Sequence, residues 1–431
     1  MSDFEIRADW VQSDDRDPVL RQTAACLTIA VKGRPLTKNI DIWSGAVHDG
    51  IVASASPLAQ WLAFSWWRLE NELLPDDLLR DFNWRYAHEL GAADHGYVWP
   101  GIQFVSDGEF MNVEMKPAVM PGQSVCYLEQ PGTVQPVPLQ EFQREASALI
   151  ESTIERLSGI SAELGDLWKI VCEDMQNPEV CAGRRLEAVM GFDPEECPAD
   201  LLKAVRQLQS RAGFFTVREM APLLKTDRSL EKRLSEENGF AAALQIPQEK
   251  IPAHPLKELL PWQRGVRAAR QLRELCGLSG EAVSDAVIRD LLGLSRGDFA
   301  RYEKQSAGLP VSVGKYDGAG QLKLIPRNKT RASGRRFELS RLLGDALTHS
   351  AAERDWLVAS DCRSARQKQQ RAFAAEFLCP IHALESYLAG DYSDSRQEAA
   401  AAYFNVSELT VKTQLVNNEK IERETAFSYT A

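Results

Sequence analysis

Two places in this sequence hold side chains with the spacing of metal ligands on a helix. The first is His88-Glu89-Leu90-Gly91-Ala92, where the position one turn after His88 holds alanine instead of a second histidine. His95 could approach His88 only if a helix continued through Gly91. The alternative is a helix end that carries two surface histidines, and the missing ligand favours it.

The second place is Asp345 and His349, which stand at i and i+4 and could ligate one cation from the same helix face. Arg341, one turn earlier, would oppose that charge. No Ser-His-Asp, Cys-His, phosphate-loop or dinucleotide fingerprint is present in the sequence. We therefore predict no metal and no cofactor, with a shifted metal site at Asp345 as an alternative.

The segment around Asp345 resembles the active helix of a peptidase family. Residues 335–347 read R-R-F-E-L-S-R-L-L-G-D-A-L, and the ImmA/IrrE-type metallopeptidase pattern reads roughly R-R-F-x-L-A-H-E-L-G-H-x-L. In that pattern two histidines bind zinc, and the glutamate between them polarises the attacking water. Arg341 and Asp345 stand at the histidine positions, and Leu342 stands at the glutamate position. The resemblance implies a peptidase frame that has lost its catalytic residues.

Three other segments follow in the family's order, so the resemblance covers roughly residues 260–418. Residues 268–280 resemble its entry helix and loop, and residues 403–415 resemble its closing segment. Residues 367–380 resemble the helix that supplies a third, acidic ligand, but here Gln, Lys and Arg surround that position. The resemblance implies a mostly helical, zincin-like C-terminal domain without a metal.

Helical periodicity divides residues 335–348 into two faces. An apolar stripe predicts the face that packs on the core; it comprises Leu339, Leu342, Leu343, Ala346 and Leu347. Arg341, Gly344, Asp345 and Thr348 lie on the other side, where an active-site cleft would be. The alternative is an ordinary amphipathic helix whose charged face contacts solvent.

The surroundings of this helix are basic. Residues 321–371 contain twelve basic and five acidic residues, whereas the whole chain has a net charge of −11. The resemblance would direct Arg341 and Lys368 or Arg371 into the former zinc cleft. Such a cleft would suit a phosphate, a carboxylate or an acidic partner segment. The predicted anion- or partner-binding residues are Arg336, Arg341, Asp345, Lys368 and Arg371; the alternative is a solvated basic face.

Residues 399–415 have the spacing of a helix-turn-helix. Asn405 can adopt the left-handed conformation of the turn, and Ser407 can cap the second helix. The second helix offers only Lys412 as a cation before Lys420, which is poor for phosphate contacts. DNA reading therefore remains an alternative to a role in closing the domain, and residues 284–301 form a second pattern of this kind.

Composition indicates an ordinary globular protein of two or three domains. Hydrophobic residues make up 44% and charged residues 26% of 431 positions. The eight cysteines are irregularly spaced, which favours reduced thiols. The first residues lack a signal sequence, and no apolar run approaches the ~18 residues of a membrane span. We expect a cytoplasmic protein with no membrane partner.

The predicted class is multidomain α+β. Residues 1–135 form a Trp-rich α+β domain, with strands near 4–11, 26–31, 103–105 and 110–115 and helices near 57–73 and 75–90. Its tryptophans 61, 66 and 67 are predicted core residues, with a recognition pocket as the alternative. Residues 139–250 are predicted to be a helical spacer or interaction region. Residues 256–431 form the peptidase-like domain, with a strand pair near 309–313 and 321–325.

These observations predict a non-catalytic regulatory or scaffold protein. The resembling family works in bacterial and phage-related regulation and defence, usually by cleaving a repressor. A member without catalytic residues would bind a protein partner or an anionic partner, of which nucleic acid is one kind, without cleaving it. The alternatives are a metal-dependent endopeptidase that uses a shifted site and a DNA-binding transcriptional regulator. The sequence does not indicate an oligomeric state.

Overall fold

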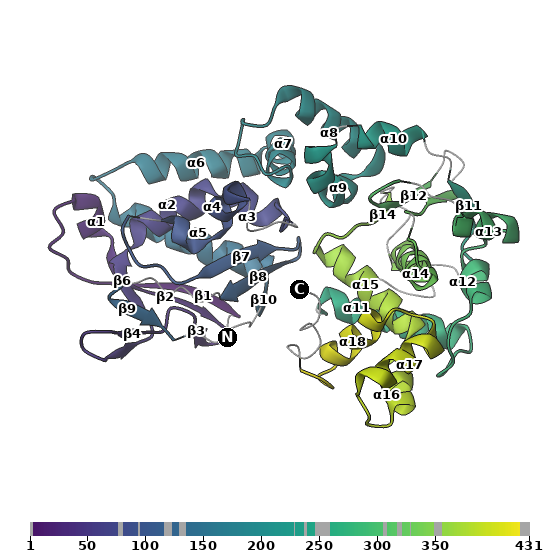
Figure 1. The fold of residues 1–431 in the computed structure, drawn as a ribbon. Helices are drawn as coiled ribbons and strands as arrows, with labels where there is room; N and C mark the ends of the chain where they lie inside the picture. The colour runs from purple at the N-terminus through teal and green to yellow at the C-terminus, as the bar shows by residue number, and fades with distance from the viewer. Residues whose placement is uncertain are drawn as a thin grey trace. The chain divides into compact units, whose positions relative to one another are not determined.

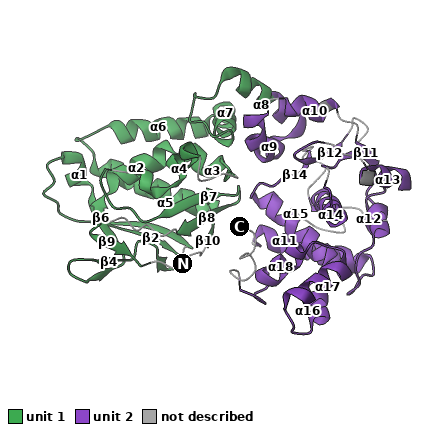
Figure 2. Ribbon diagram, in the orientation of Figure 1, with its two compact units in different colours: residues 1–206 green, residues 207–431 purple. Residues whose placement is uncertain are grey.

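A computed structural model describes residues 3–75, 81–93, 95–115, 123–128, 135–227, 229–236, 239–245, 259–304, 308–316, 321–327, 329–348 and 356–422. The chain divides into two compact units, residues 1–206 and residues 207–431 (Figure 2). Each unit mixes helices with small antiparallel sheets and has its own hydrophobic core. The predicted α+β class is confirmed at this level.

Unit 1 contains three antiparallel sheets (Figure 1). The first joins β1 (Phe4–Trp10), β2 (Ala24–Val31), β3 (Arg34–Pro35) and β6 (Ile51–Ser54). The second has the order β10 (Gln135–Pro138), β8 (Phe110–Met115) and β7 (Ile102–Ser106). The third has the order β5 (Val47–His48), β4 (Asn39–Asp41) and β9 (Val125–Tyr127). The four predicted strands are confirmed as β1, β2, β7 and β8.

The helices of unit 1 are α1 (Pro18–Gln22), α2 (Ala55–Phe64), α3 (Trp66–Asn71), α4 (Phe82–His88), η1 (Leu90–Ala93), α5 (Leu139–Arg156), α6 (Glu163–Gln176) and α7 (Pro178–Val189). The helix predicted near 57–73 is thus two helices, α2 and α3. Only α4 is observed of the helix predicted near 75–90, and residues 76–80 lie outside the described ranges. Trp61, Trp66 and Trp67 are all buried, as predicted for core residues.

The structure differs from the predicted helical region at 139–250. Helices α5 to α7 bury Phe142, Leu149 and Trp168 in the core of unit 1. Helix α8 (Ala199–Ala212) spans the boundary, whereas α9 (Phe214–Thr226), α10 (Leu230–Glu236) and β11 (Phe240–Ala242) belong to unit 2. Helical periodicity predicts that a face is buried but not which core it joins, so the boundary could not be placed from this pattern.

Unit 2 has a four-stranded sheet with the order β11-β13-β12-β14. The predicted strand pair is observed as β12 (Ser312–Tyr316) and β13 (Leu322–Ile325), with Val313 opposite Ile325. The predicted turn at 317–320 lies outside the described residues. Strands β11 and β14 (Leu357–Ala359) extend the pair on both sides and were not predicted.

The helices of unit 2 after the β11 strand are α11 (Pro261–Leu275), α12 (Asp285–Leu291), α13 (Arg296–Lys304), α14 (Ala332–Thr348), α15 (Ala365–Leu378), α16 (Ile381–Leu388), α17 (Asp394–Phe404) and α18 (Glu408–Asn417). Helix α14 contacts α11, α12, α15, β12 and β14 (Figure 1). The predicted apolar stripe of α14 is buried, but so is every residue from 338 to 348. The prediction that the face with Arg341 and Asp345 borders an open cleft is therefore wrong, because other elements of unit 2 cover that face too.

The helix-turn-helix spacing is confirmed as local geometry. Asn405 has φ 52° and ψ 50°, the left-handed conformation that ends α17. The Ser407 hydroxyl accepts a hydrogen bond from the Thr410 amide at 3.2 Å and caps α18. In the second pattern Ser284 caps α12 in the same way. Within the described parts of the chain, no helix has the length and apolar character needed to cross a bilayer.

Candidate functional site

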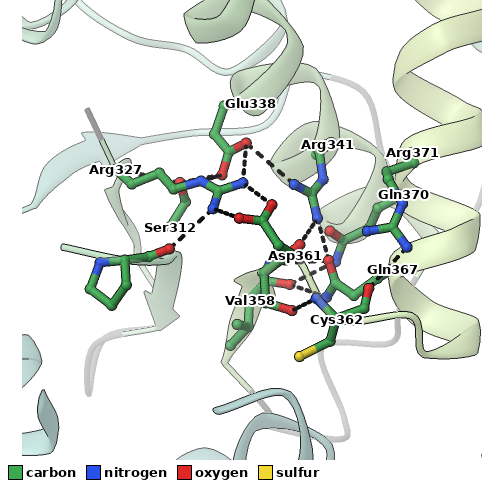
Figure 3. Close-up of polar contacts among 12 residues, drawn as sticks. Ser312, Arg327, Glu338, Arg341, Val358, Asp361, Cys362, Gln367, Gln370 and Arg371 are labelled. Atoms are coloured by element: carbon green, nitrogen blue, oxygen red, sulfur yellow. Dashed lines mark hydrogen bonds and ion pairs between the residues drawn. The ribbon is translucent and has the colours of Figure 1, made fainter. Parts of the chain in front are cut away.

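The polar face of α14 meets four other segments in a largely buried group of side chains, the Arg341 network, of which only Asp361 is exposed (Figure 3). Its members are Ser312, Arg327, Glu338, Arg341, Ser360, Asp361 and Gln367. They come from β12, the end of β13, α14, the segment after β14, and α15. The network therefore connects the sheet of unit 2 to both helices that carry the peptidase-like motifs.

Arg327 joins two carboxylates. Its Nε donates to Glu338 Oε1 at 2.8 Å, and its two Nη atoms donate to both oxygens of Asp361 at 2.7 and 2.8 Å. Burial would lower the pKa of Arg327, but its hydrogen bonds and charge interactions with Asp361 and Glu338 raise the pKa overall. The hydrogen bonds from Arg327 lower the pKa of Asp361 to about 2. Two parallel, charge-assisted hydrogen bonds of this kind keep Arg327 and Asp361 ionised.

Arg341 stands at the first histidine position of the peptidase pattern and is 2% exposed. Its Nη1 lies 3.4 Å from Glu338 Oε2, and its Nη2 donates to the Ser360 carbonyl at 2.5 Å and to Gln367 Oε1. Burial lowers the pKa of Arg341, and the charge of Glu338 opposes this shift. The Nε atom of Arg341 is buried without a hydrogen-bond partner among the described residues.

Gln367 fixes the other side of Arg341. Its Oε1 also accepts from the Ser360 amide at 3.1 Å, while its Nε2 donates to the Val358 carbonyl at 2.7 Å. Gln370, one turn along α15, donates to the same Val358 carbonyl at 2.9 Å. The segment that resembles a ligand-bearing helix thus uses neutral amides, and these amides hold β14 against α15.

Asp345 stands at the second histidine position and is fully buried. Arg366 holds it through two hydrogen bonds of 2.8 Å, from Nε to Oδ1 and from Nη2 to Oδ2. His349, its partner in the shifted metal site, lies outside the described residues. Both carboxylate oxygens of Asp345 therefore already hold a cationic partner within the protein.

Glu219 of α9 was not predicted to take part in this region. It is 2% exposed and accepts hydrogen bonds from Ser360 Oγ at 2.9 Å and from Ser364 Oγ. Burial raises its pKa, although both hydroxyls oppose that shift. Because Glu219 lies more than 100 residues from its partners, no local spacing could have predicted it. The i, i+3 spacing of Glu338 and Arg341 was the one local signal for this ion pairing.

The structure separates the five predicted anion-binding residues into different environments. Arg341 and Arg371 lie near each other (Figure 3), and the half-buried Arg371 donates to the Cys362 carbonyl at 2.9 Å. Burial, followed by the charge of Arg341, lowers the pKa of Arg371 to about 10. Lys368 is half-buried one turn away. Arg336 is 3% exposed and faces elsewhere, contacting Asp285 and the Val283 and Asn405 carbonyls.

Both Nη atoms of Arg341 already contact groups of the protein, namely Glu338, Ser360 and Gln367, and Arg366 binds both carboxylate oxygens of Asp345. No group of three or more His, Cys, Asp or Glu side chains in the described ranges is placed to hold a metal ion. The charges at this site connect segments of unit 2 to one another.

His88 differs from the surface histidine that the sequence favoured. It is fully buried, with Nδ1 2.9 Å from the Phe104 carbonyl and Nε2 3.3 Å from Glu72 Oε2. The Trp84 ring stacks on it at 4.2 Å, and Arg68 pairs with Glu72 at 2.8 Å. His95 is exposed. The two histidines thus do not share one exposed surface, because the chain turns away after α4.

Comparison with known proteins yields no match of this chain to a protein-family model, to a curated protein or to a solved structure.

Proposed function

We propose that this chain is a non-catalytic regulatory or scaffold protein that binds a protein partner, with unit 2 as a peptidase-like frame in which an ion-pair network replaces a metal centre. The observation that supports this most strongly is Arg341. At the position where the resembling pattern has its first zinc-binding histidine, the chain has a buried cation that already contacts Glu338, Ser360 and Gln367.

The endopeptidase alternative has less support. A shifted metal site would need Asp345 as a ligand, and Asp345 is bound to Arg366 by two hydrogen bonds. Removing one partner of a buried ion pair typically costs about 3–5 kcal/mol. Leu342, at the position of the catalytic glutamate, is fully buried and cannot accept a proton from water.

The DNA-binding alternative has less support as well. Lys412, the cation of α18, lies 3.5 Å from Asp394, so its charge already has an acidic neighbour. The outer surface of α18 also presents Glu408 and Leu409, and Leu409 is 59% exposed. A helix that reads DNA needs several unopposed cations for phosphate contacts.

The test combines metal analysis with partner capture. We expect the purified full-length protein to carry no stoichiometric zinc, and a partner captured with it to remain intact during incubation with added zinc. The matched control is Asp345→Ala, which removes the only described carboxylate of the alternative site. About one zinc per chain that is lost in Asp345→Ala, or zinc-dependent cleavage of the partner, would contradict the proposal.

A further inference from the structure

Trp43 is an exception among the tryptophans of unit 1. It is 87% exposed. Of the other tryptophans of unit 1, Trp10 is half-buried and the remaining six are buried; these six are Trp61, Trp66, Trp67, Trp84, Trp99 and Trp168. Two other residues of the same turn region are apolar and exposed too, with Ile42 at 55% and Val47 at 54%. A folded chain gains nothing from leaving an indole in water, so this side chain has no evident role in the stability of unit 1.

The turn that carries Trp43 is nevertheless well built. Asp41 Oδ1 accepts hydrogen bonds from the Trp43 amide at 3.0 Å, the Ser44 amide at 2.7 Å and the Ser44 hydroxyl at 2.9 Å. Gly45 closes the turn with φ +70° and donates to the Asp41 carbonyl at 2.8 Å. The turn follows β4, which pairs with strands on both sides. The backbone at Trp43 is therefore ordered before any partner arrives, which lowers the entropic cost of binding.

Two observations on charge indicate what kind of partner fits the turn: unit 1 is acidic as a whole, and the turn carries the carboxylate of Asp41. Unit 1 contains 33 acidic and 17 basic residues, a net charge of −16, whereas unit 2 contains 28 and 33, a net charge of +5. Hydrogen bonds from Ser44 lower the pKa of Asp41, so its carboxylate is charged at neutral pH. Its second oxygen, Oδ2, has no hydrogen bond or ion pair within the described residues. An indole and a carboxylate two residues apart on one turn each attract a cation.

We propose that the turn formed by residues 41–47, the Trp43 turn, is the docking site for an arginine-bearing protein segment. The guanidinium would stack on the Trp43 ring and donate to Asp41 Oδ2, while apolar neighbours of the arginine would pack on Ile42 and Val47. Arginine fits better than lysine, because its planar group can stack and donate at the same time. This inference rests on the proposed partner binding and gives it a location in unit 1.

The experiment measures binding of two labelled nonapeptides to the full-length protein. One peptide alternates arginine with valine, and the other has glutamine in place of each arginine. Salt of about 0.15 M screens charges more than about 8 Å apart and so limits the general attraction of an acidic unit. We expect only the arginine peptide to bind, and Trp43→Ala to weaken this binding roughly tenfold or more. Trp43→Phe should keep part of the affinity.

Two further variants make the result specific. Asp41→Asn keeps an Oδ1 acceptor for the turn but removes the charge, so it should also weaken the arginine peptide. Phe82→Ala is the matched control, because Phe82 is 71% exposed in the same unit and should not matter. Equal binding of both peptides, unchanged binding in Trp43→Ala, or an equal loss in Phe82→Ala would overturn the inference. A partner that Trp43→Ala still captures would also overturn it but would leave the proposed function standing.

Discussion

At the level of single residues, unit 2 has buried charged side chains at the two positions, Arg341 and Asp345, where the resembling pattern has zinc-binding histidines. Asp345 and Arg366 illustrate the consequence, since both are almost completely buried and bind each other through two hydrogen bonds. Such pairs contribute little net stability, because desolvation of the charges offsets their attraction. The loss of one partner is costly, since the remaining charge stays buried without compensation.

We therefore expect Arg366→Met to destabilise unit 2 by roughly 3–5 kcal/mol, because Asp345 would keep a buried charge. The double variant Asp345→Leu/Arg366→Met should recover most of this loss, since it removes both charges together. Urea unfolding followed by circular dichroism would measure both effects. Arg301→Gln is the control, because Arg301 is largely exposed, and it should change stability by less than about 1 kcal/mol. A double variant less stable than Arg366→Met would contradict this explanation.

Glu70 provides a pH-dependent prediction in unit 1. Burial raises its pKa to about 7, against the opposing effects of the hydrogen bond from Gln143 and the charge of Arg185. The folded state therefore binds a proton more tightly than the unfolded state, and unit 1 should lose stability as pH rises from about 4.5 to about 7. Glu70→Gln keeps an acceptor for Gln143 and should reduce this slope, by on the order of 1–3 kcal/mol across the window.

Unfolding of wild type and Glu70→Gln at pH 5 and pH 8 would test this. The variant should gain stability relative to wild type at pH 8 and not at pH 5. An identical pH dependence for the two proteins would show that Glu70 does not titrate in this range. Glu155→Gln is a suitable control, since Glu155 is exposed on α5 of the same unit.

At the level of elements, two glycines allow α11, α14 and α15 to pack closely. A Cβ atom on Gly265 of α11 would lie 2.2 Å from the Gln369 carbonyl oxygen of α15. A Cβ atom on Gly344 of α14 would lie 2.4 Å from the ring of Phe373. Helix propensity alone would favour alanine at both positions by up to about 1 kcal/mol. The close contacts should reverse that preference.

We expect Gly265→Ala and Gly344→Ala each to destabilise unit 2 by roughly 1–3 kcal/mol, because the helices would have to move apart. Gly265→Ala should cost more, since its nearest neighbour is backbone that cannot change rotamer. Gly297→Ala in α13 is the matched control, because the nearest atom to its added Cβ is 3.8 Å away. Thermal unfolding of the three variants would measure the difference, and equal stability of all three would rule out this tight packing.

The elements also differ in how well the sequence predicts them. The turn at Asn405 and the cap at Ser407 were predictable, because their signals act within about four residues. The apolar stripe of α14 was predictable for the same reason. The burial of its polar face was not, because Arg327 and Gln367 reach it from distant segments. Strands β11 and β14 are three residues long each, which is too short for a periodic pattern.

At the level of the whole molecule, the two units have different chemical characters. Unit 1 is strongly acidic and presents an exposed Trp43 on an ordered turn, whereas unit 2 is mildly basic and pairs Arg327, Arg341 and Arg366 with carboxylates in its interior. The net charge of −11 is the sum of −16 for unit 1 and +5 for unit 2. The total therefore does not reveal that the two units differ in charge. If unit 1 provides the partner surface, the network of unit 2 can serve stability without binding a ligand itself.

This division of roles predicts the result of introducing the three residues of the peptidase pattern that the sequence resembles. The triple variant Arg341→His/Leu342→Glu/Asp345→His would leave Arg366 without Asp345 and would remove the partner of Gln367 and Ser360. It would also place a carboxylate where Leu342 is fully buried in the core. Burying that group and breaking the ion pair should together destabilise unit 2 by about 5 kcal/mol or more.

We therefore expect the triple variant to lose the folded state of unit 2 instead of gaining zinc-dependent cleavage. Circular dichroism and zinc titration of the triple variant, with Arg341→His alone as the comparison, would measure this. The single variant should retain more structure, because Leu342 and Asp345 keep their native environments. A folded triple variant that binds one zinc and cleaves a captured partner would show that unit 2 can accept a metal centre. That result would mean that the ion pairs merely fill the site, whereas unfolding would mean that the core of unit 2 now depends on them.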